Sequence, residues 1–298
     1  MYSFKKNDLK YICSYFGSKL RFLNELTLLI PLNCNTMYEV CGGLGSFILN
    51  RHWWFDKAVY NEYNEKIYNL INVIKNIDTR DRFIEELDNI PNNKEEFEKA
   101  LYQYNNDFPD ITDKVEQAKI VYMLLTQSYN CEKKNWVKKV ISKNKNVNIK
   151  RRLKKVAKEL EKININNGNC FDIIEENKNN TGVWIYADVP YPQDTDRVSE
   201  NSYDNEKYDW PLELHEEFVN KVKGINSDTG CKILICTYDS PTYNKLLEDT
   251  GYWHKIQIKK LPSPSGKKGE KRNVRIEYVY VNYTNYSELA KHLVIPVK

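Results

Sequence analysis

The sequence has no long apolar segment and no arrangement of cysteine or histidine that suits a metal ion. No run approaches the roughly 20 apolar residues of a membrane-spanning helix, and residues 1–10 lack the apolar stretch of a signal peptide. The seven cysteines are odd in number and contain no CxxC pair, and the four histidines have no metal-ligand spacing. We therefore expect a soluble, cytoplasmic protein with free thiols, no bound metal and no membrane contact.

A large net charge is also missing, because the formal charge is only +4 over 298 residues. The distribution of charge is uneven, with 13 basic and 2 acidic residues between Lys133 and Lys162. A solvated helix face explains most charge runs. Contact with nucleic-acid phosphates is the alternative, and such binding would weaken steeply with salt because counterions are released. The residues assigned to DNA contact are Lys138, Lys139, Lys150, Arg151, Arg152, Lys154 and Lys155.

Short apolar segments predict the strands of a buried sheet. Residues 36–40, 57–60, 182–187 and 232–237 are compact and apolar, as expected of parallel strands that are covered on both faces. Residues 254–261 and 274–283 alternate with period two and flank a loop rich in Pro, Gly and Ser, which predicts an antiparallel hairpin. These patterns indicate an α/β protein with a mostly parallel, doubly wound sheet and one reversed strand near its C-terminal edge.

The middle of the chain predicts helices instead. From about residue 78 to residue 163 no strong strand pattern occurs, and residues 113–127 and 149–161 have helical periodicity. A helix is also predicted for residues 65–74 and another for 212–222. We expect a catalytic domain made of residues 1–64 and 165–298, interrupted by a helical insertion at residues 65–164.

Two motifs at predicted strand ends are suited to a nucleotide-like cofactor. The first strand runs through Glu39 into a turn with Cys41, Gly43 and a Gly-x-Gly spacing, where the backbone can approach a ligand. The spacing differs from the dinucleotide GxGxxG pattern, so a plain tight turn stays an alternative. Glu62 follows the second strand, where a carboxylate can accept hydrogen bonds from ribose hydroxyls. An exposed strand-end carboxylate is the other interpretation.

A third motif carries the catalytic hypothesis. The strand at 182–187 leads into Asp188, Val189, Pro190 and Tyr191. This geometry suits enzymes that methylate an amino group such as N6 of adenine. The N6 lone pair is delocalised into the ring, so hydrogen-bond acceptors for N6–H are needed before this nitrogen can attack a methyl donor. The Asp188 side chain and the Val189 carbonyl can supply them, while Pro190 stiffens the turn. Tyr191 can stack on a base swung out of the duplex. A plain strand and turn is the alternative.

Taken in order, these motifs resemble the Dam-like (D12 class) DNA adenine methyltransferases. The segment 188–191 is similar to the family signature DPPY, with Val189 in place of the first proline. Glu62 stands where the family usually has Asp. Other similar segments are 15–19 (a YxGSK-like element), 39–46 (the cofactor loop, with Val40 and Cys41 where Pro and Phe are usual), 61–64, 168–172 and 272–280.

The resemblance implies a Rossmann-like S-adenosylmethionine-dependent methyltransferase that transfers a methyl group to N6 of a flipped adenine in double-stranded DNA. It implies that the insertion recognises the target. Two alternatives are an RNA methyltransferase of related fold and a catalytically inactive DNA-binding relative, the latter motivated by the Val189 and Glu62 departures. Implied cofactor contacts are Tyr15, Lys19, Glu39, Cys41, Gly43, Glu62 and Asp188.

Some expectations concern the setting and single aromatic residues. We expect a bacterial or phage-encoded monomer or weak dimer, and any restriction endonuclease partner would be a separate chain. Trp53 and Trp54 follow the glycine turn closely, and core packing is favoured for them over ligand stacking. Tyr238 ends a central strand, where it either flanks the flipped base or packs in the core.

Overall fold

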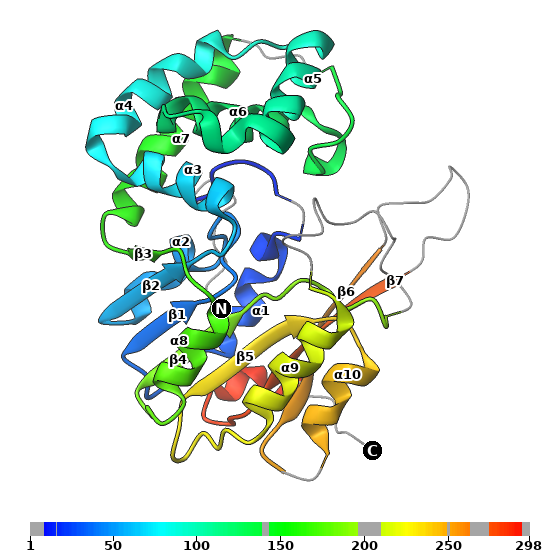
Figure 1. The fold of residues 1–298 in the computed structure, drawn as a ribbon. Helices are drawn as coiled ribbons and strands as arrows, with labels where there is room; N and C mark the ends of the chain where they lie inside the picture. The colour runs from blue at the N-terminus through cyan, green and yellow to red at the C-terminus, as the bar shows by residue number, and fades with distance from the viewer. Residues whose placement is uncertain are drawn as a thin grey trace.

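A seven-stranded sheet forms the centre of the molecule, in the order β3-β2-β1-β4-β5-β7-β6 (Figure 1). The computed structural model describes residues 9–15, 17–138, 143–195, 210–248, 251–262 and 274–293. Neighbouring strands from β3 to β5 are parallel, whereas β7 is antiparallel to both β5 and β6. The predicted fold class, with one reversed strand near the C-terminal edge, is therefore confirmed. The strands are β1 (Thr36–Glu39), β2 (Lys57–Asn61), β3 (Asn164–Asn166), β4 (Val183–Ala187), β5 (Lys232–Thr237), β6 (His254–Pro262) and β7 (Val274–Val281).

The apolar strands form because both of their faces are covered. Alternate residues of β4 belong to two different hydrophobic clusters, with Trp184 and Tyr186 in one and Val183 and Ile185 in the other. The first cluster includes side chains of α1 (Leu23–Leu28) and α2 (Ile48–Arg51), which cover one face of the sheet. The other face is covered by α8 (Cys170–Asn177), α9 (Leu212–Lys223) and α10 (Pro241–Asn244).

The sequence analysis missed β3, which pairs with β2 and forms one edge of the sheet. It has three residues, and the two asparagines are exposed while Ile165 is half-buried. So short and polar a segment shows no apolar periodicity, and only its pairing with β2 makes it a strand.

Five helices lie together at one end of the sheet, as Figure 1 shows. Helix α3 packs against α6 and α7, and α4 and α5 pack against α6. Asparagine or aspartate side chains cap the first four of these helices, so some of the abundant asparagines act as N-caps. In the described residues between 78 and 163 there is one isolated bridge and no strand. The five helices are α3 (Glu65–Lys75), α4 (Ile77–Glu86), α5 (Lys94–Tyr102), α6 (Lys114–Gln127) and α7 (Lys143–Leu160).

The predicted helices are present, but α7 begins at Lys143 and not near residue 149. The first residues of α7 are polar and lack the apolar spacing from which the helix was predicted. No helix in the described part of the chain has the length and apolar character needed to cross a bilayer.

The expectation of core packing for Trp53 and Trp54 is wrong. Both residues belong to the short 3-10 turn η3 (His52–Trp54) that precedes β2. Their side chains are 47% and 53% exposed. The turn directs its first residue, His52, into the protein, so that the two tryptophans that follow face outward.

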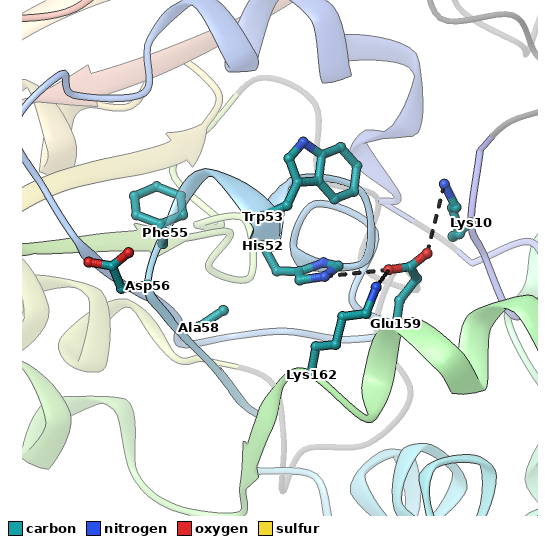
Figure 2. A pocket seen from close by; sticks show the side chains of 8 residues that line it. All are labelled: Lys10, His52, Trp53, Phe55, Asp56, Ala58, Glu159 and Lys162. Carbon is teal, nitrogen blue, oxygen red and sulfur yellow. Dashed lines mark hydrogen bonds and ion pairs between the residues drawn. The ribbon is translucent and has the colours of Figure 1, made fainter.

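His52 and two lysines surround the carboxylate of Glu159, as Figure 2 shows. The His52 ring lies at the side of a hollow of about 540 Å³ and points to Glu159 of α7, with 3.4 Å between Nε2 and Oε2. The Nζ atoms of Lys10 and Lys162 lie 4.0 and 3.3 Å from the same carboxylate. Glu159 thus joins α7 to the N-terminal segment and to the turn before β2.

Candidate active site

The glycine turn, residues 42–45, connects β1 to α2 and fits closely against two tyrosines. A Cβ atom on Gly42 would lie 2.2 Å from the Tyr60 ring. Gly43 has a φ of +50°, and a Cβ there would lie 2.9 Å from the Tyr15 ring. The Tyr60 hydroxyl donates a 2.6 Å hydrogen bond to the Gly43 carbonyl. These contacts fix the turn in one conformation, and a side chain at Gly42 or Gly43 would collide with its neighbours.

Glu62 lies one residue beyond β2 and holds the turn from the side. Its two oxygens accept hydrogen bonds from the backbone N–H groups of Gly43 (2.7 Å) and Asn64 (2.8 Å). Burial raises the pKa of Glu62 above its usual value, although these two hydrogen bonds and the charge of Lys133 oppose that rise. A carboxylate has about four acceptor sites, so Glu62 can still accept two further donors. Glutamate is therefore accommodated at this position.

Glu39, at the end of β1, does not line the cavity that is shared by the glycine turn, Glu62 and Asp188. It is 2% exposed, and its Oε2 atom accepts a 2.8 Å hydrogen bond from the backbone N–H of Ile48 at the start of α2. Burial raises the pKa of Glu39 to about 8, although the backbone N–H groups of Ile48 and Phe47 oppose that shift. A cofactor contact for Glu39 stays a prediction, and the contact that it makes here is with α2.

This burial should make stability depend on pH. The pKa of Glu39 is about 8 in the folded protein against 4.5 for an unperturbed glutamate, so the folded state retains a proton that the unfolded chain releases between these values. The contribution of Glu39 to the free energy of unfolding therefore falls as pH rises from about 4.5 to 8. Glu39→Gln keeps an acceptor for Ile48 and removes the titration. Thermal melts should show that the variant gains more stability, relative to wild type, at pH 8 than at pH 5. An equal difference at both pH values would contradict this assignment.

Asp188, directly after β4, forms an ion pair with Lys19. Lys19 Nζ lies 2.6 Å from Asp188 Oδ1 and 2.8 Å from the Tyr191 hydroxyl. Tyr191 in turn donates to Glu277 Oε2 of β7 at 3.1 Å. Burial alone would lower the pKa of Lys19, but Asp188, Tyr191 and Glu277 raise it well above its usual value. Burial raises the pKa of Asp188, and Lys19 opposes this shift. The buried ammonium group of Lys19 thus stabilises the Asp188 carboxylate.

Two tyrosines lie side by side beyond this ion pair. The Tyr191 and Tyr238 rings have centroids 4.2 Å apart and are tilted by 31°. Tyr238 is 9% exposed, so it packs against Tyr191 at the end of β5. Lys19 Nζ lies 4.9 Å from the centroid of the Tyr191 ring, on which it makes a cation–π contact. The arrangement provides an aromatic wall beside the Asp188 carboxylate.

The glycine turn, Glu62 and the Asp188 loop line one cavity, which we call the strand-end cavity. Its volume is about 540 Å³, within the range of about 300–1,000 Å³ that is usual for small-molecule sites. It lies at the carboxyl ends of β1, β2 and β4, where ligands bind in open α/β sheets. The predicted site residues that line it are Tyr15, Lys19, Cys41, Gly43, Glu62, Asp188, Val189, Pro190 and Tyr191.

Asn61, the last residue of β2, is a supporting residue to which the sequence analysis assigned no role of its own. Its amide nitrogen donates to the carbonyls of Val40 (3.0 Å) and Gly168 (2.9 Å), and its oxygen accepts from the Gly168 N–H (3.0 Å). It thus ties the start of the glycine turn to the loop after β3. The available signal was a polar residue at the end of an apolar strand.

The loop after β3 and the start of α8 also contribute to the cavity wall, through Asn169, Cys170 and Phe171. The Asn169 side chain caps α8 by accepting from the Phe171 N–H. Asp172 is exposed and does not line the strand-end cavity. The acid of this segment therefore lies outside the cavity.

The basic residues assigned to DNA contact differ in their surroundings. Lys150 pairs with Asp88, with 2.5 Å between Nζ and Oδ2. Arg152 donates to the Ile12 carbonyl at 2.9 Å and covers the Tyr11 ring, so it binds α7 to the N-terminal segment. Lys139 lies outside the described residues. The exposed members of the set are Lys138, Arg151, Lys154 and Lys155.

The described part of the chain contains no group of three or more His, Cys, Asp or Glu residues able to hold a metal ion.

The sheet order, the glycine turn and the strand-end carboxylates define a Rossmann-like methyltransferase. The model of the D12 class N6 adenine-specific DNA methyltransferase family matches residues 15–261, and the chain belongs to this family. A comparison with curated proteins finds no match. The chain is thus an enzyme that methylates adenine in DNA, and its family implies S-adenosylmethionine as the methyl donor.

Proposed function

We propose that the strand-end cavity binds S-adenosylmethionine beside an adenine flipped out of double-stranded DNA, and that Asp188 and the Val189 carbonyl orient N6 toward the donor. One observation carries this proposal: the glycine turn, Glu62, Asp188 and Tyr191 line the same cavity. Cofactor and base can therefore meet within one cavity. Direct transfer needs this proximity more than it needs a covalent intermediate.

The residues around the glycine turn fit the proposed cofactor. The backbone at Gly42 and Gly43 can approach a ligand closely because neither residue has a side chain. Glu62 keeps acceptor capacity for two ribose hydroxyls after its bonds to the turn. Tyr15, Lys19 and Cys41 complete the lining on this side. When bound, the cofactor supplies an electrophilic methyl group on a sulfonium centre.

Glu62→Ala should weaken binding of S-adenosylhomocysteine by about 100-fold or more, since it removes two hydrogen bonds and each bond to a charged acceptor contributes about 1.5–3 kcal/mol. Isothermal titration calorimetry measures the change. Glu62→Gln keeps one acceptor oxygen and should lie between the Ala variant and wild type. Cofactor affinity that survives in the Ala variant would remove Glu62 from the proposed site.

The catalytic steps use Asp188, Lys19 and Tyr191. Lys19 contacts Oδ1 of Asp188, which leaves Oδ2 to accept a hydrogen bond from N6–H. Two acceptors around N6 favour a tetrahedral nitrogen, and its lone pair can then attack the methyl carbon. S-adenosylmethionine would supply the methyl group to N6, and Asp188 is placed to take the proton that N6 would release. Tyr191 stacks on the flipped base and holds it against the carboxylate.

We propose that residues 65–164 form the target-recognition insertion and that DNA lies along the basic face of α7. Exposed Arg151, Lys154 and Lys155 support this placement, since they lie on one helix and can reach phosphates. The enzyme would act as a monomer or weak dimer in the cytoplasm of a bacterium or a phage-infected cell, and any restriction endonuclease would be a separate chain.

A transfer assay tests the function directly. Purified protein and labelled S-adenosylmethionine are incubated with DNA, RNA or protein, and the nucleosides are separated after digestion. We expect N6-methyladenine in DNA only. Label in RNA would favour the related RNA methyltransferase, and DNA binding without turnover would favour an inactive relative.

A further inference from the structure

A short turn between α6 and α7 brings a lysine from the helical insertion to the strand-end cavity. The Tyr129 N–H donates to the Asn135 carbonyl at 2.9 Å, and Ser128 pairs with Trp136 in an antiparallel bridge. We call residues 128–136 the 128–136 turn. At its tip, Cys131, Glu132 and Lys133 line the strand-end cavity. The turn therefore belongs to the cavity wall although its residues lie within the insertion.

The backbone of this tip is strained. Cys131 has a φ of 64° and Lys133 a φ of 56°, and they are the two non-glycine residues with positive φ in the described chain. Such conformations are unfavourable for residues with a side chain, and they persist only where the surroundings impose them. The Ser128 hydroxyl accepts a 2.9 Å hydrogen bond from the Lys133 N–H and so helps to fix the conformation. Strain of this kind is concentrated at functional sites.

The strained backbone aims a charged side chain into the protein. Lys133 is 4% exposed, and its Nζ atom lies 5.6 Å from the centroid of the Tyr104 ring. Lys133 and Glu62 line the same cavity and attract each other electrostatically. Lys66 of α3, whose Nζ atom also lies near the Tyr104 ring, repels Lys133. Among the described residues, Lys133 is the cation that stabilises the ionised form of Glu62.

We propose that Lys133 is a positioning residue that acts through Glu62, keeping this carboxylate ionised for the cofactor and making cofactor binding depend on the placement of the 128–136 turn. The inference rests on the proposed function, because it assigns Glu62 to the cofactor. Tyr129 in the same turn is 59% exposed, so the turn has one side at the protein surface and the other at Glu62. DNA that moves the turn would change the distance from Lys133 to Glu62.

Coupling of this kind is reciprocal, since DNA that raises cofactor affinity must have its own affinity raised by the same factor. We expect plasmid DNA to strengthen binding of S-adenosylhomocysteine by about 5-fold or more in the wild-type enzyme, within the usual range for coupled sites. Lys133→Met removes the charge and keeps the length of the side chain. It should reduce the coupling factor to near one.

The pH dependence distinguishes this role from simple packing. Besides Glu62 and Lys66, the titratable groups that act on Lys133 are Cys13 and Cys131. The negative charge of Glu62 also raises the pKa of Tyr60, Glu39 and Cys41, and none of these three side chains is a cation. Burial and Lys66 lower the pKa of Lys133 to about 8, so its charge is present below that pH and lost above it. Without Lys133 the pKa of Glu62 rises further, and affinity is lost at a higher pH.

The experiment measures S-adenosylhomocysteine affinity by calorimetry from pH 6 to 9, with and without unmethylated plasmid DNA. Lys133→Met should bind more weakly than wild type at pH 6.5, approach wild type at pH 9, and show its acidic midpoint moved upward. Lys134→Met removes the same charge from the exposed neighbouring residue and should leave cofactor affinity unchanged. Lys133→Arg keeps the charge and should restore the wild-type midpoint.

The outcomes separate this inference from the proposed function. An enzyme that binds cofactor and methylates DNA, with the same acidic midpoint in wild type and Lys133→Met, would overturn the role of Lys133 alone. Wild-type protein that binds no cofactor would overturn the proposed function itself. If Lys133→Met unfolds at assay temperature, the comparison of Lys133→Arg with wild type decides, because a shifted midpoint despite the retained charge contradicts the proposal.

Discussion

Asp188→Ala should lower the rate of methyl transfer by about 10³-fold, the upper range for loss of one preorganised hydrogen-bonding group at a reacting centre. The carboxylate is the acceptor that makes N6 nucleophilic in the proposed reaction, and Ala provides none. DNA affinity should stay nearly unchanged, because Asp188 lies inside the strand-end cavity and the exposed basic residues lie on α7. Single-turnover methylation at saturating cofactor measures the chemical step, and electrophoretic mobility shifts measure DNA affinity.

Asp188→Asn is the matched control for this prediction. It keeps an acceptor oxygen at the same position but loses the ion pair with Lys19. We expect it to retain more activity than the Ala variant. In both variants Lys19 keeps its contacts with Tyr191 and with the Gly17 carbonyl, so thermal melts should confirm that the fold survives. Wild-type activity in Asp188→Ala would exclude the proposed mechanism.

The parts of the fold that could be predicted are those in which burial dictates the sequence pattern. Strands β4 and β5 are covered on both faces, so they must be short, continuous and apolar. Helix α9 repeats its buried residues at helical spacing for the same reason. The edge strand β3 buries little, and hydrogen bonds to β2 alone define it, so its sequence holds no comparable signal.

The predictable part of the site consists of residues next to strand ends in the chain. Glu62 and Asp188 each follow a strand directly, and parallel strands bring their carboxyl ends to one edge of the sheet. Glu39 also ends a strand, but its side chain turns to the start of α2, and this choice depends on packing. Lys133 is distant from these residues in the sequence and reaches the cavity only because the fold brings the turn between α6 and α7 to it, so local pattern could not place it there.

Replacing Arg151, Lys154 and Lys155 together by Ala should flatten the salt dependence of DNA binding. Each phosphate contact contributes about 0.9 to the slope of log K against log salt, so the loss of three contacts should reduce the slope by about 2.7. These three residues are exposed on α7, whereas Arg152 binds the N-terminal segment and Lys150 pairs with Asp88. The triple variant therefore removes surface charge without breaking those contacts. Fluorescence anisotropy at several salt concentrations measures the slope.

A charge-matched variant shows whether the effect is local. Lys57 lies at the start of β2, Lys178 follows α8 and Lys221 is near the end of α9, so all three lie at the end of the sheet opposite the strand-end cavity. Replacing them by Ala changes net charge by the same amount, and the long-range effect of net charge is screened within about 10 Å at 0.1 M salt. We expect that variant to keep the wild-type slope. If both triple variants reduce the slope equally, DNA is attracted by overall charge and α7 is not its binding surface. If neither does, the basic residues of α7 form a solvated helix face.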